Sequence, residues 1–355
     1  MKKTMLTALM TGPRKIELVE RDIPVPGPDQ VLIRLEYVGI CGSDLHILEK
    51  DWGGRVTAPH VLGHECAGVV VEAGSRVGNP LPGDRVAVEP GRTCGKCEYC
   101  RTGRYNLCRE VKFLAAPNTP ASPQVDGAFC EYLAHDADLC FKLPERLSTL
   151  EGALIEPLAV GFHAANQGGA RPGQSAVVVG AGCIGLVSMM ALRICGVARV
   201  FVCDIMKNRL AKAAELGADA AVDSRDPAAA ADRLLELTGG AGCDLAVDTA
   251  GISAMAGETV RALKKGANLV LVGYSPDGSL VIPLREIINK EITLRSVFRY
   301  RNIYPMAIES AAAGLVDLKR IVSNVYPLSE APRALAEGLE NKASIVKSVL
   351  RMPVP

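Results

Sequence analysis

Four cysteines fall within one short stretch and form the clearest chemical motif of the chain. Cys94, Cys97, Cys100 and Cys108 follow the pattern Cys-x2-Cys-x2-Cys-x7-Cys in a loop of Gly, Arg, Lys and Tyr. Four thiolates in so short a loop can converge tetrahedrally on one Zn2+ and leave no open position, which is the property of a structural site. Iron–sulfur ligation and a redox disulfide pair are the alternatives. Zinc is favoured because nothing in the sequence points to electron transfer.

A second motif, Gly-Ala-Gly-Cys-Ile-Gly at residues 180 to 185, lies between a predicted strand and a predicted helix. Gly180 would make the tight turn, Gly182 would let the backbone approach a pyrophosphate, and Gly185 would let helix and strand pack closely. Asp204 ends the next predicted strand, at the separation where a carboxylate meets an adenosine ribose. Because this carboxylate would repel a 2′-phosphate, the motif predicts NAD rather than NADP. An ordinary glycine-rich turn is the alternative.

Cys41, His64 and Glu65 supply a thiolate, an imidazole and a carboxylate. These are enough for a second zinc ion that keeps one position open for water or substrate. A lone Cys or His is more often a core residue, however, and one adjacent His-Glu pair does not define a site. Asp44 is either a hydrogen-bonding support for a ligand or part of a helix cap. The residues alone therefore leave this metal site open.

The order of the predicted elements divides the chain into two domains. Residues 1 to 155 contain short strand-like runs separated by Pro and Gly, which predicts a β-rich, barrel-like domain. Residues 156 to 297 alternate apolar strands with Ala- and Leu-rich helices, as a parallel sheet covered on both faces requires. The first of these predicted strands covers residues 175–179 and the last covers residues 291–294. Residues 298 to 355 are expected to return to the first domain. The predicted fold class is α/β, with a doubly wound Rossmann sheet beside a β-rich domain.

Composition limits the classes of partner. The 355 residues suggest about two domains, and the 48% hydrophobic and 22% charged content is typical of a soluble globular protein. A net charge of +1 gives no electrostatic reason to expect nucleic acid or an anionic membrane as partner. The first ten residues lack a long apolar core, so we expect neither a signal peptide nor a membrane span. These features favour a cytoplasmic protein whose twelve cysteines stay reduced.

Several stretches, in this order, resemble the zinc-dependent medium-chain dehydrogenase/reductase family. They are Gly-Ile-Cys-Gly-Ser-Asp-Leu-His from residue 39, Gly-His-Glu-Cys-Ala-Gly from residue 63, the four-cysteine loop and the glycine turn. Residues 152–161 and 296–302 resemble its sorbitol (polyol) dehydrogenase branch. The resemblance covers nearly the whole chain. It implies a GroES-like catalytic domain built from both chain ends, with the Rossmann domain between them.

The resemblance also implies roles in the catalytic domain. Ser43 would take the proton of the alcohol and pass it through the cofactor ribose to His46, whose imidazole suits proton exchange near neutral pH. The four-cysteine loop would hold a second, structural zinc, which makes two zinc ions per chain. Glu156 would bind the catalytic zinc directly or through water. The ligands implied for that ion are Cys41, His64, Glu65 and Glu156.

Cofactor and substrate contacts are implied in the same way. Arg299 and Tyr300, together with Glu156, would contact the hydroxyls of the substrate. The implied NAD contacts are Gly180, Gly182, Ile184, Gly185, Asp204, Arg209, Gly273, Val297, Phe298 and Arg299.

The activity implied is the reversible oxidation of a secondary hydroxyl of a polyol, similar to sorbitol, xylitol or galactitol, to a ketose with NAD. A related secondary-alcohol dehydrogenase, acting on threonine or butanediol, is one alternative. A non-catalytic NAD-binding protein on the same fold is another. The resemblance further implies a homo-oligomer, a tetramer or dimer, joined through strands of the Rossmann sheet.

Overall fold

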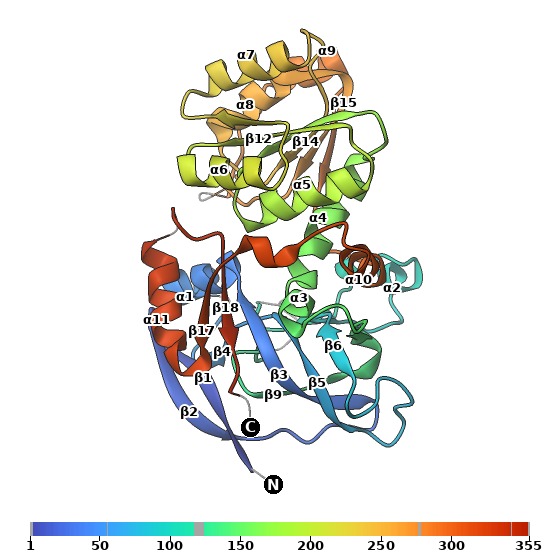
Figure 1. The fold of residues 1–355 in the computed structure, drawn as a ribbon, viewed down its shortest axis with the longest axis vertical. Helices are drawn as coiled ribbons and strands as arrows, with labels where there is room; N and C mark the ends of the chain where they lie inside the picture. The colour runs from blue at the N-terminus through green and yellow to red at the C-terminus, as the bar shows by residue number, and fades with distance from the viewer. Residues whose placement is uncertain (1–2, 55, 117–123, 276–277, 342, 354–355) are drawn as a thin grey trace. The chain divides into compact units, whose positions relative to one another are not determined.

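The computed structural model describes residues 3–54, 56–116, 124–275, 278–341 and 343–353 (Figure 1). The chain forms two compact units. One comprises Met1–Glu156 and Tyr304–Pro355, and the other comprises Pro157–Ile303. Residues 298–303, assigned to the first domain from the sequence, lie in the second unit.

The first unit is built on a seven-stranded sheet to which both ends of the chain contribute (Figure 1). Its order is β10-β6-β5-β3-β18-β17, and β9 also pairs with β3. The strands are β3 (Gln30–Ile40), β5 (Glu65–Ala73), β6 (Arg85–Val88), β9 (Tyr132–Asp136), β10 (Cys140–Lys142), β17 (Val322–Pro327) and β18 (Lys347–Arg351). Because β18 pairs antiparallel with β3, the last strand of the chain lies beside an early one.

Two smaller sheets and several helices complete this unit. The sheets are β2 (Lys15–Asp22), β1 (Thr4–Gly12) and β4 (His60–Val61) in that order, and the pair β7 (Gly91–Arg92) and β8 (Lys112–Phe113). The helices are α1 (Gly42–Gly54), α2 (Glu98–Arg101), α3 (Thr149–Ala153), α10 (Tyr304–Ala312) and α11 (Ala331–Glu340). Alternate residues of β3, including Ile33 and Leu35, are fully buried and form a core with Leu62 and Phe129. This period of two is what a half-buried strand requires.

The second unit contains a six-stranded sheet in the order β13-β12-β11-β14-β15-β16, and every pair in it is parallel. The strands are β11 (Ser175–Val179), β12 (Arg199–Asp204), β13 (Ala220–Asp223), β14 (Cys243–Asp248), β15 (Leu263–Leu271) and β16 (Thr293–Ser296). All residues of β11 are buried, as a central strand covered on both faces must be. This sheet and the β-rich unit confirm the predicted α/β fold class.

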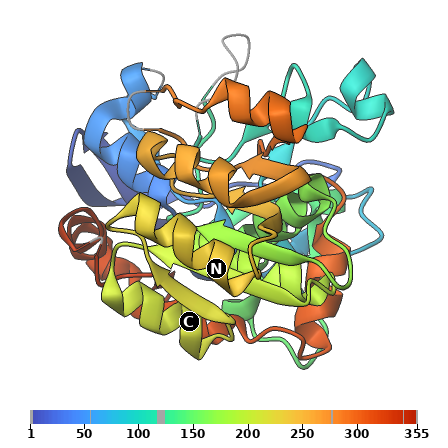
Figure 2. The same cartoon turned by 90° about the horizontal axis from the view of Figure 1, so that it is seen from above.

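Helices cover both faces of the parallel sheet. They are α4 (Ile155–Gly168), α5 (Cys183–Ile194), α6 (Lys207–Glu215), α7 (Pro227–Leu237), α8 (Ser253–Ala262) and α9 (Leu284–Lys290). Figure 1 shows α5 and α6 on one face and α7, α8 and α9 on the other, and Figure 2 shows the yellow and orange helices of the second face next to one another. The direction of winding reverses between β11 and β14, the switch point where open parallel sheets bind ligands at the carboxyl ends of their strands.

None of the helices in the described ranges is long and apolar enough to cross a membrane.

Candidate active site

Cys41 lies where strand β3 passes into helix α1, and the carboxylate of Asp44 holds it there. Asp44 is fully buried, and its Oδ2 accepts the backbone N–H of Cys41 at 2.9 Å. Its Oδ1 accepts the N–H of Gly63 at 3.0 Å and lies 3.7 Å from Nδ1 of His64. One carboxylate therefore joins the start of the helix to the segment that carries the next two candidate ligands.

Glu65 is the first residue of strand β5 and His64 directly precedes it, and both lie beside Cys41. The ligand atoms of these three residues all lie within 4.8 Å of one another. Two ligands bonded tetrahedrally to one Zn2+ at about 2.0–2.3 Å lie roughly 3.3–3.8 Å apart, so a group confined within 4.8 Å is close to the spacing that a shared ion requires. His64 is 5% exposed and Glu65 is fully buried. The three side chains form a set of zinc donors that leaves a coordination position for a further ligand.

The electrostatic surroundings of His64 favour a cation. Burial opposes protonation of its imidazole, but the Asp44 carboxylate and the Cys41 sulfur hold the pKa of His64 well above its ordinary value. A metal ion would interact favourably with the same negative neighbours. The Phe113 ring lies against His64, with the ring centroids 5.5 Å apart.

Lys347 is a residue of this site that the sequence did not reveal. Its Nζ donates to both carboxylate oxygens of Glu65, at 2.7 and 2.8 Å, and to the carbonyl oxygen of Ile40 at 3.1 Å. Lys347 is 3% exposed, so the ion pair is buried. The two partners are 282 positions apart in the chain, and only the pairing of β18 with β3 brings them together. No local motif carries that signal.

The other residues assigned to this chemistry lie nearby in sequence or in space. Glu156, in the first turn of α4, is 5% exposed. Its carboxylate is not part of the group within 4.8 Å that the described residues form. Burial raises the pKa of the Cys66 thiol, and the nearby charge of Glu156 raises it further. Ser43, half-buried, and His46, exposed, are three positions apart on α1 and therefore share one face of the helix.

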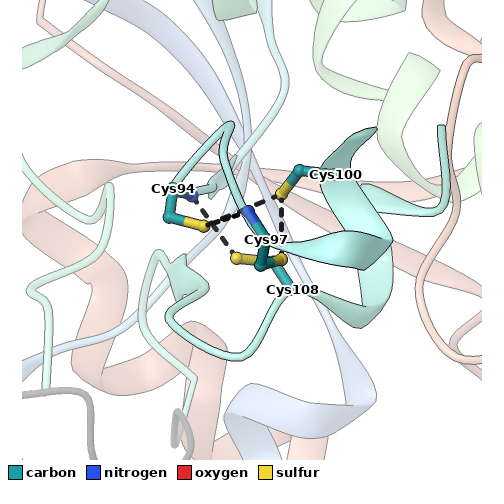
Figure 3. Close-up of side chains that lie close together, drawn as sticks. All are labelled: Cys94, Cys97, Cys100 and Cys108. Atoms are coloured by element: carbon teal, nitrogen blue, oxygen red, sulfur yellow. Dashed lines mark hydrogen bonds between the residues drawn. The ribbon is translucent and has the colours of Figure 1, made fainter. Parts of the chain in front are cut away.

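The four-cysteine loop brings its thiols together (Figure 3). Sγ of Cys100 lies 4.0 Å from that of Cys94 and 3.6 Å from that of Cys97. Sulfurs bonded tetrahedrally to one Zn2+ at about 2.3 Å are roughly 3.8 Å apart, so the loop already has nearly that geometry. Backbone N–H groups of Cys94 and Glu110 donate to Sγ of Cys108, at 3.3 and 3.4 Å. These donors stabilise negative sulfur.

The charge balance of the loop also fits a cation. The N–H of Cys100 lowers the pKa of the Cys97 thiol to about 6. Burial, with the neighbouring Cys94 and Cys100, raises the pKa of Cys108 to about 12. Four thiolates therefore require a compensating positive charge, which zinc would supply.

The glycine turn after β11 has the conformation that its sequence predicts. Gly180 has a φ of +94°, a left-handed conformation that favours glycine. A side chain at Gly185 would collide with the Gly180 carbonyl oxygen. A Cβ added at Gly182 would meet nothing within 4 Å, so the backbone there is open to a close approach by a ligand. The Thr249 hydroxyl donates to the Val179 carbonyl at 2.8 Å, which ties the turn to β14.

Asp204 fixes the glycine turn as well as ending its strand. Its Oδ2 accepts the N–H of Ala181 at 2.7 Å, and its Oδ1 accepts the N–H of Met206 at 2.8 Å. A carboxylate has about four acceptor positions, so each oxygen can still accept from a ribose hydroxyl. Asp204 is 8% exposed, at the carboxyl end of the sheet.

The remaining predicted cofactor residues belong to the same unit. Ile184 lies in the first turn of α5 and Arg209 in α6. Gly273 follows β15 and donates its N–H to the Asp248 carbonyl at 3.0 Å. Val297 follows β16 and donates to the Leu271 carbonyl at 2.9 Å.

Residues 298–300 differ in exposure. Phe298 is 43% exposed, and the guanidinium of Arg299 lies 4.8 Å from the centre of its ring. Arg299 has a φ of +57°, uncommon for a residue with a long side chain. Tyr300 is 3% exposed, so its ring is almost entirely enclosed.

Two family models match the chain. The alcohol dehydrogenase GroES-like domain matches residues 27–145, and the zinc-binding dehydrogenase domain matches residues 183–313. Human sorbitol dehydrogenase is 40% identical over 94% of this chain and 92% of its own, and the Bacillus subtilis enzyme of that name is 38% identical over 97% and 96%.

The similarity extends to solved structures. An Escherichia coli oxidoreductase of unknown specificity superposes with a TM-score of 0.93 at 38% identity, over 99% of this chain and all of that one. A 2R,3R-butanediol dehydrogenase from Bacillus subtilis superposes with a TM-score of 0.88 at 30% identity, over 99% of this chain and all of its own.

Proposed function

Because the chain belongs to the zinc-dependent medium-chain dehydrogenase/reductase family, in its sorbitol dehydrogenase branch, we propose that it reversibly oxidises a secondary hydroxyl of a polyol to a ketose with NAD. That it is an oxidoreductase follows from the family. The observation that supports the finer proposal is the group of half-buried Cys41 with buried His64 and Glu65, whose orientation Asp44 fixes.

The proposed roles divide between the bound groups and the chain's own residues. When bound, zinc supplies a Lewis acid for the alcohol oxygen and the nicotinamide supplies a hydride acceptor. Asp44 keeps Cys41 and His64 oriented as ligands. Ser43 would accept the alcohol proton as it releases its own hydroxyl proton, and His46, exposed on the same helix face, would exchange a proton with water.

The remaining assignments are proposed for the same chemistry. Glu156 would complete the catalytic zinc site directly or through water, and Arg299 and Tyr300 would contact further hydroxyls. The four-cysteine loop would hold the structural zinc, for two ions per chain. Asp204 would accept from the adenosine ribose and select NAD over NADP, while the glycine turn, Ile184, Arg209, Gly273 and residues 297–299 line the cofactor site.

A panel of substrates tests the activity. Turnover of sorbitol, xylitol, galactitol, 2,3-butanediol and threonine with NAD should be fastest for a polyol. Turnover of threonine alone would remove the polyol assignment. Butanediol is the second candidate substrate, because the butanediol dehydrogenase of Bacillus subtilis superposes over 99% of the chain.

Metal content tests whether the protein is catalytic at all. The purified protein should hold about two zinc ions per chain, and Cys41→Ser should hold one and lose turnover. Cys195→Ser, which changes a cysteine at the end of α5, is the matched control and should keep both ions and full activity. Wild-type turnover by Cys41→Ser would contradict the catalytic zinc.

Assembly and location are proposed on separate grounds. In the described part of the chain β16 pairs only with β15, and its four residues are all exposed. Such an edge favours pairing with a second copy, so we propose a homo-oligomer, most simply a tetramer, joined through this strand. In the described part of the chain none of the twelve cysteines forms a disulfide, which supports a proposed location in the reducing cytoplasm.

A further inference from the structure

The buried ion pair of Glu65 and Lys347 puts a positive charge directly behind one candidate zinc ligand. Nζ of Lys347 lies 2.7 and 2.8 Å from the two carboxylate oxygens and 3.1 Å from the Ile40 carbonyl oxygen. These three acceptor oxygens match the three N–H donors of an ammonium group. A buried, fully bonded lysine of this kind has one defined position, unlike a surface lysine.

Three adjacent strands build the arrangement. In the order β5-β3-β18, Glu65 pairs with Gly39 across one side of β3, and Ser348 pairs with Ile40 across the other. Lys347 therefore reaches across the end of β3 to Glu65. Gly39 makes room for this contact, because a Cβ there would collide with Oε2 of Glu65. The sheet thus reserves a position for the pair next to Cys41.

The positive charge of Lys347 changes the charge balance around a zinc ion bound by Cys41, His64 and Glu65. The Cys41 thiolate and the Glu65 carboxylate together would neutralise a Zn2+ ion. Lys347 adds one positive charge to that set and shares the carboxylate that the ion would use. Without the ammonium, Glu65 would be a buried carboxylate with less compensation, and a cation would be bound more tightly.

We propose that Lys347 is a positioning residue that orients Glu65 and limits how strongly it binds zinc, so that the catalytic ion keeps a net positive charge and remains a strong Lewis acid. The inference rests on the proposed zinc site of Cys41, His64 and Glu65. It does not depend on which alcohol is oxidised.

The test measures metal affinity directly. Zinc is removed from the open site of the full-length protein by dialysis against a chelator, and Zn2+ and Co2+ are titrated back in competition with that chelator. Lys347→Met should bind Zn2+ on the order of tenfold more tightly than wild type, because a nearby positive charge is lost. Its Co2+ absorption bands should shift, because the carboxylate donates more strongly. Lys347→Arg should restore wild-type affinity and spectrum.

Two controls separate this effect from a loss of packing. In a Glu65→Gln background, Lys347→Met should change affinity far less, since the charge it compensates is gone. Lys290→Met removes a lysine of the second unit whose Nζ also donates to backbone carbonyls, and it should leave metal affinity unchanged. If Lys347→Met folds poorly, Lys347→Gln takes its place in the single and the double variant, because the coupling is the double-variant effect minus both single-variant effects.

The outcomes distinguish the two proposals. Weaker or equal Zn2+ binding by Lys347→Met, with an unchanged Co2+ spectrum, would overturn the role of Lys347 while leaving the zinc site standing. If wild type bound no metal beyond the ion of the four-cysteine loop, the zinc site itself would fail.

Discussion

Glu89 shows what burial does to a single acidic residue in this protein. It follows β6, is 3% exposed, and accepts a hydrogen bond from the Tyr105 hydroxyl at 2.9 Å. Burial raises the pKa of its carboxyl from 4.5 to about 7, against the opposing effect of the Tyr105 hydrogen bond. The folded protein therefore keeps this proton at pH values where the unfolded chain has lost it.

The raised pKa of Glu89 makes the protein less stable as pH rises. Between pH 4.5 and about 7, the unfolded chain binds fewer protons at this group, so the free energy of unfolding falls as pH rises, and above pH 7 the loss is complete. The loss amounts to about 3 kcal/mol at 1.36 kcal/mol per pKa unit.

Urea unfolding at pH 5 and pH 8 should show Glu89→Gln gaining stability relative to wild type by up to that amount. Glu72→Gln, an exposed position on β5, should show no such gain; equal pH profiles for all three proteins would contradict the effect.

Asp204 joins the selection of the cofactor to the shape of its binding turn. Its carboxylate holds the N–H groups of Ala181 and Met206, so Asp204→Ala should loosen the turn as well as remove a ribose acceptor. The Kd for NAD should rise on the order of tenfold or more, and the preference for NAD over NADP should shrink. Calorimetric titration of both cofactors measures this. Asp223→Ala, at the paired position of β13, is the control, and an unchanged NAD to NADP ratio in Asp204→Ala would remove Asp204 from the ribose.

At the level of elements, the sequence predicts central strands better than edge strands. The predicted strand 175–179 coincides with β11, because a short apolar run rich in Val and followed by glycine favours a buried strand over a helix. The predicted strand 291–294 is wrong by two residues, since Glu291 has a φ of +51° and ends α9, so that β16 begins at Thr293. Residues of an exposed edge strand carry no apolar pattern to mark their limits.

The same reasoning explains what was missed near the metal site. Cys41, His64 and Glu65 could be named from residue type, and Asp44 from its place between them. The limits of helix α1 could not be predicted, because this helix has no strong apolar stripe. The ion pair of Lys347 with Glu65 could not be predicted either, because it depends on the pairing of β18 with β3, which are far apart in the sequence. Residue chemistry is local in sequence, whereas the contacts that tune it are not.

Strand β16 provides a prediction at this scale. Its exposed Leu294 lies on the open edge of the parallel sheet, where a second copy could pair. Leu294→Asp places a charge in that contact and should convert the proposed oligomer to smaller species in sedimentation equilibrium. Leu315→Asp alters a more exposed leucine of the other unit and should leave the oligomer intact. A wild-type protein that is monomeric at micromolar concentration would contradict the proposal.

At the scale of the whole molecule, the proposed metal and cofactor sites occupy different compact units. The metal-site residues, 41, 64, 65 and 94–108, lie in the unit built from both chain ends, and the cofactor turn lies in the unit between them. A ligand that binds only the folded state stabilises the unit that holds it, by about 2.7 kcal/mol at one hundred times its Kd. Each ligand should therefore leave its own pattern of protection along the chain.

Hydrogen exchange measured by mass spectrometry reads that pattern. NAD should slow exchange up to about 100-fold in residues 180–185 and 204–209, and removal of zinc should speed it in residues 41–44, 63–65 and 94–108. Strand β1, which carries none of the proposed ligands, is the internal reference. The N–H groups of Ala181 and Met206 donate to the Asp204 carboxylate, which is proposed to bind the ribose. Their exchange should therefore be the exchange that NAD slows most. Unchanged exchange at 180–185 with saturating NAD would place the cofactor elsewhere, whatever the metal sites show.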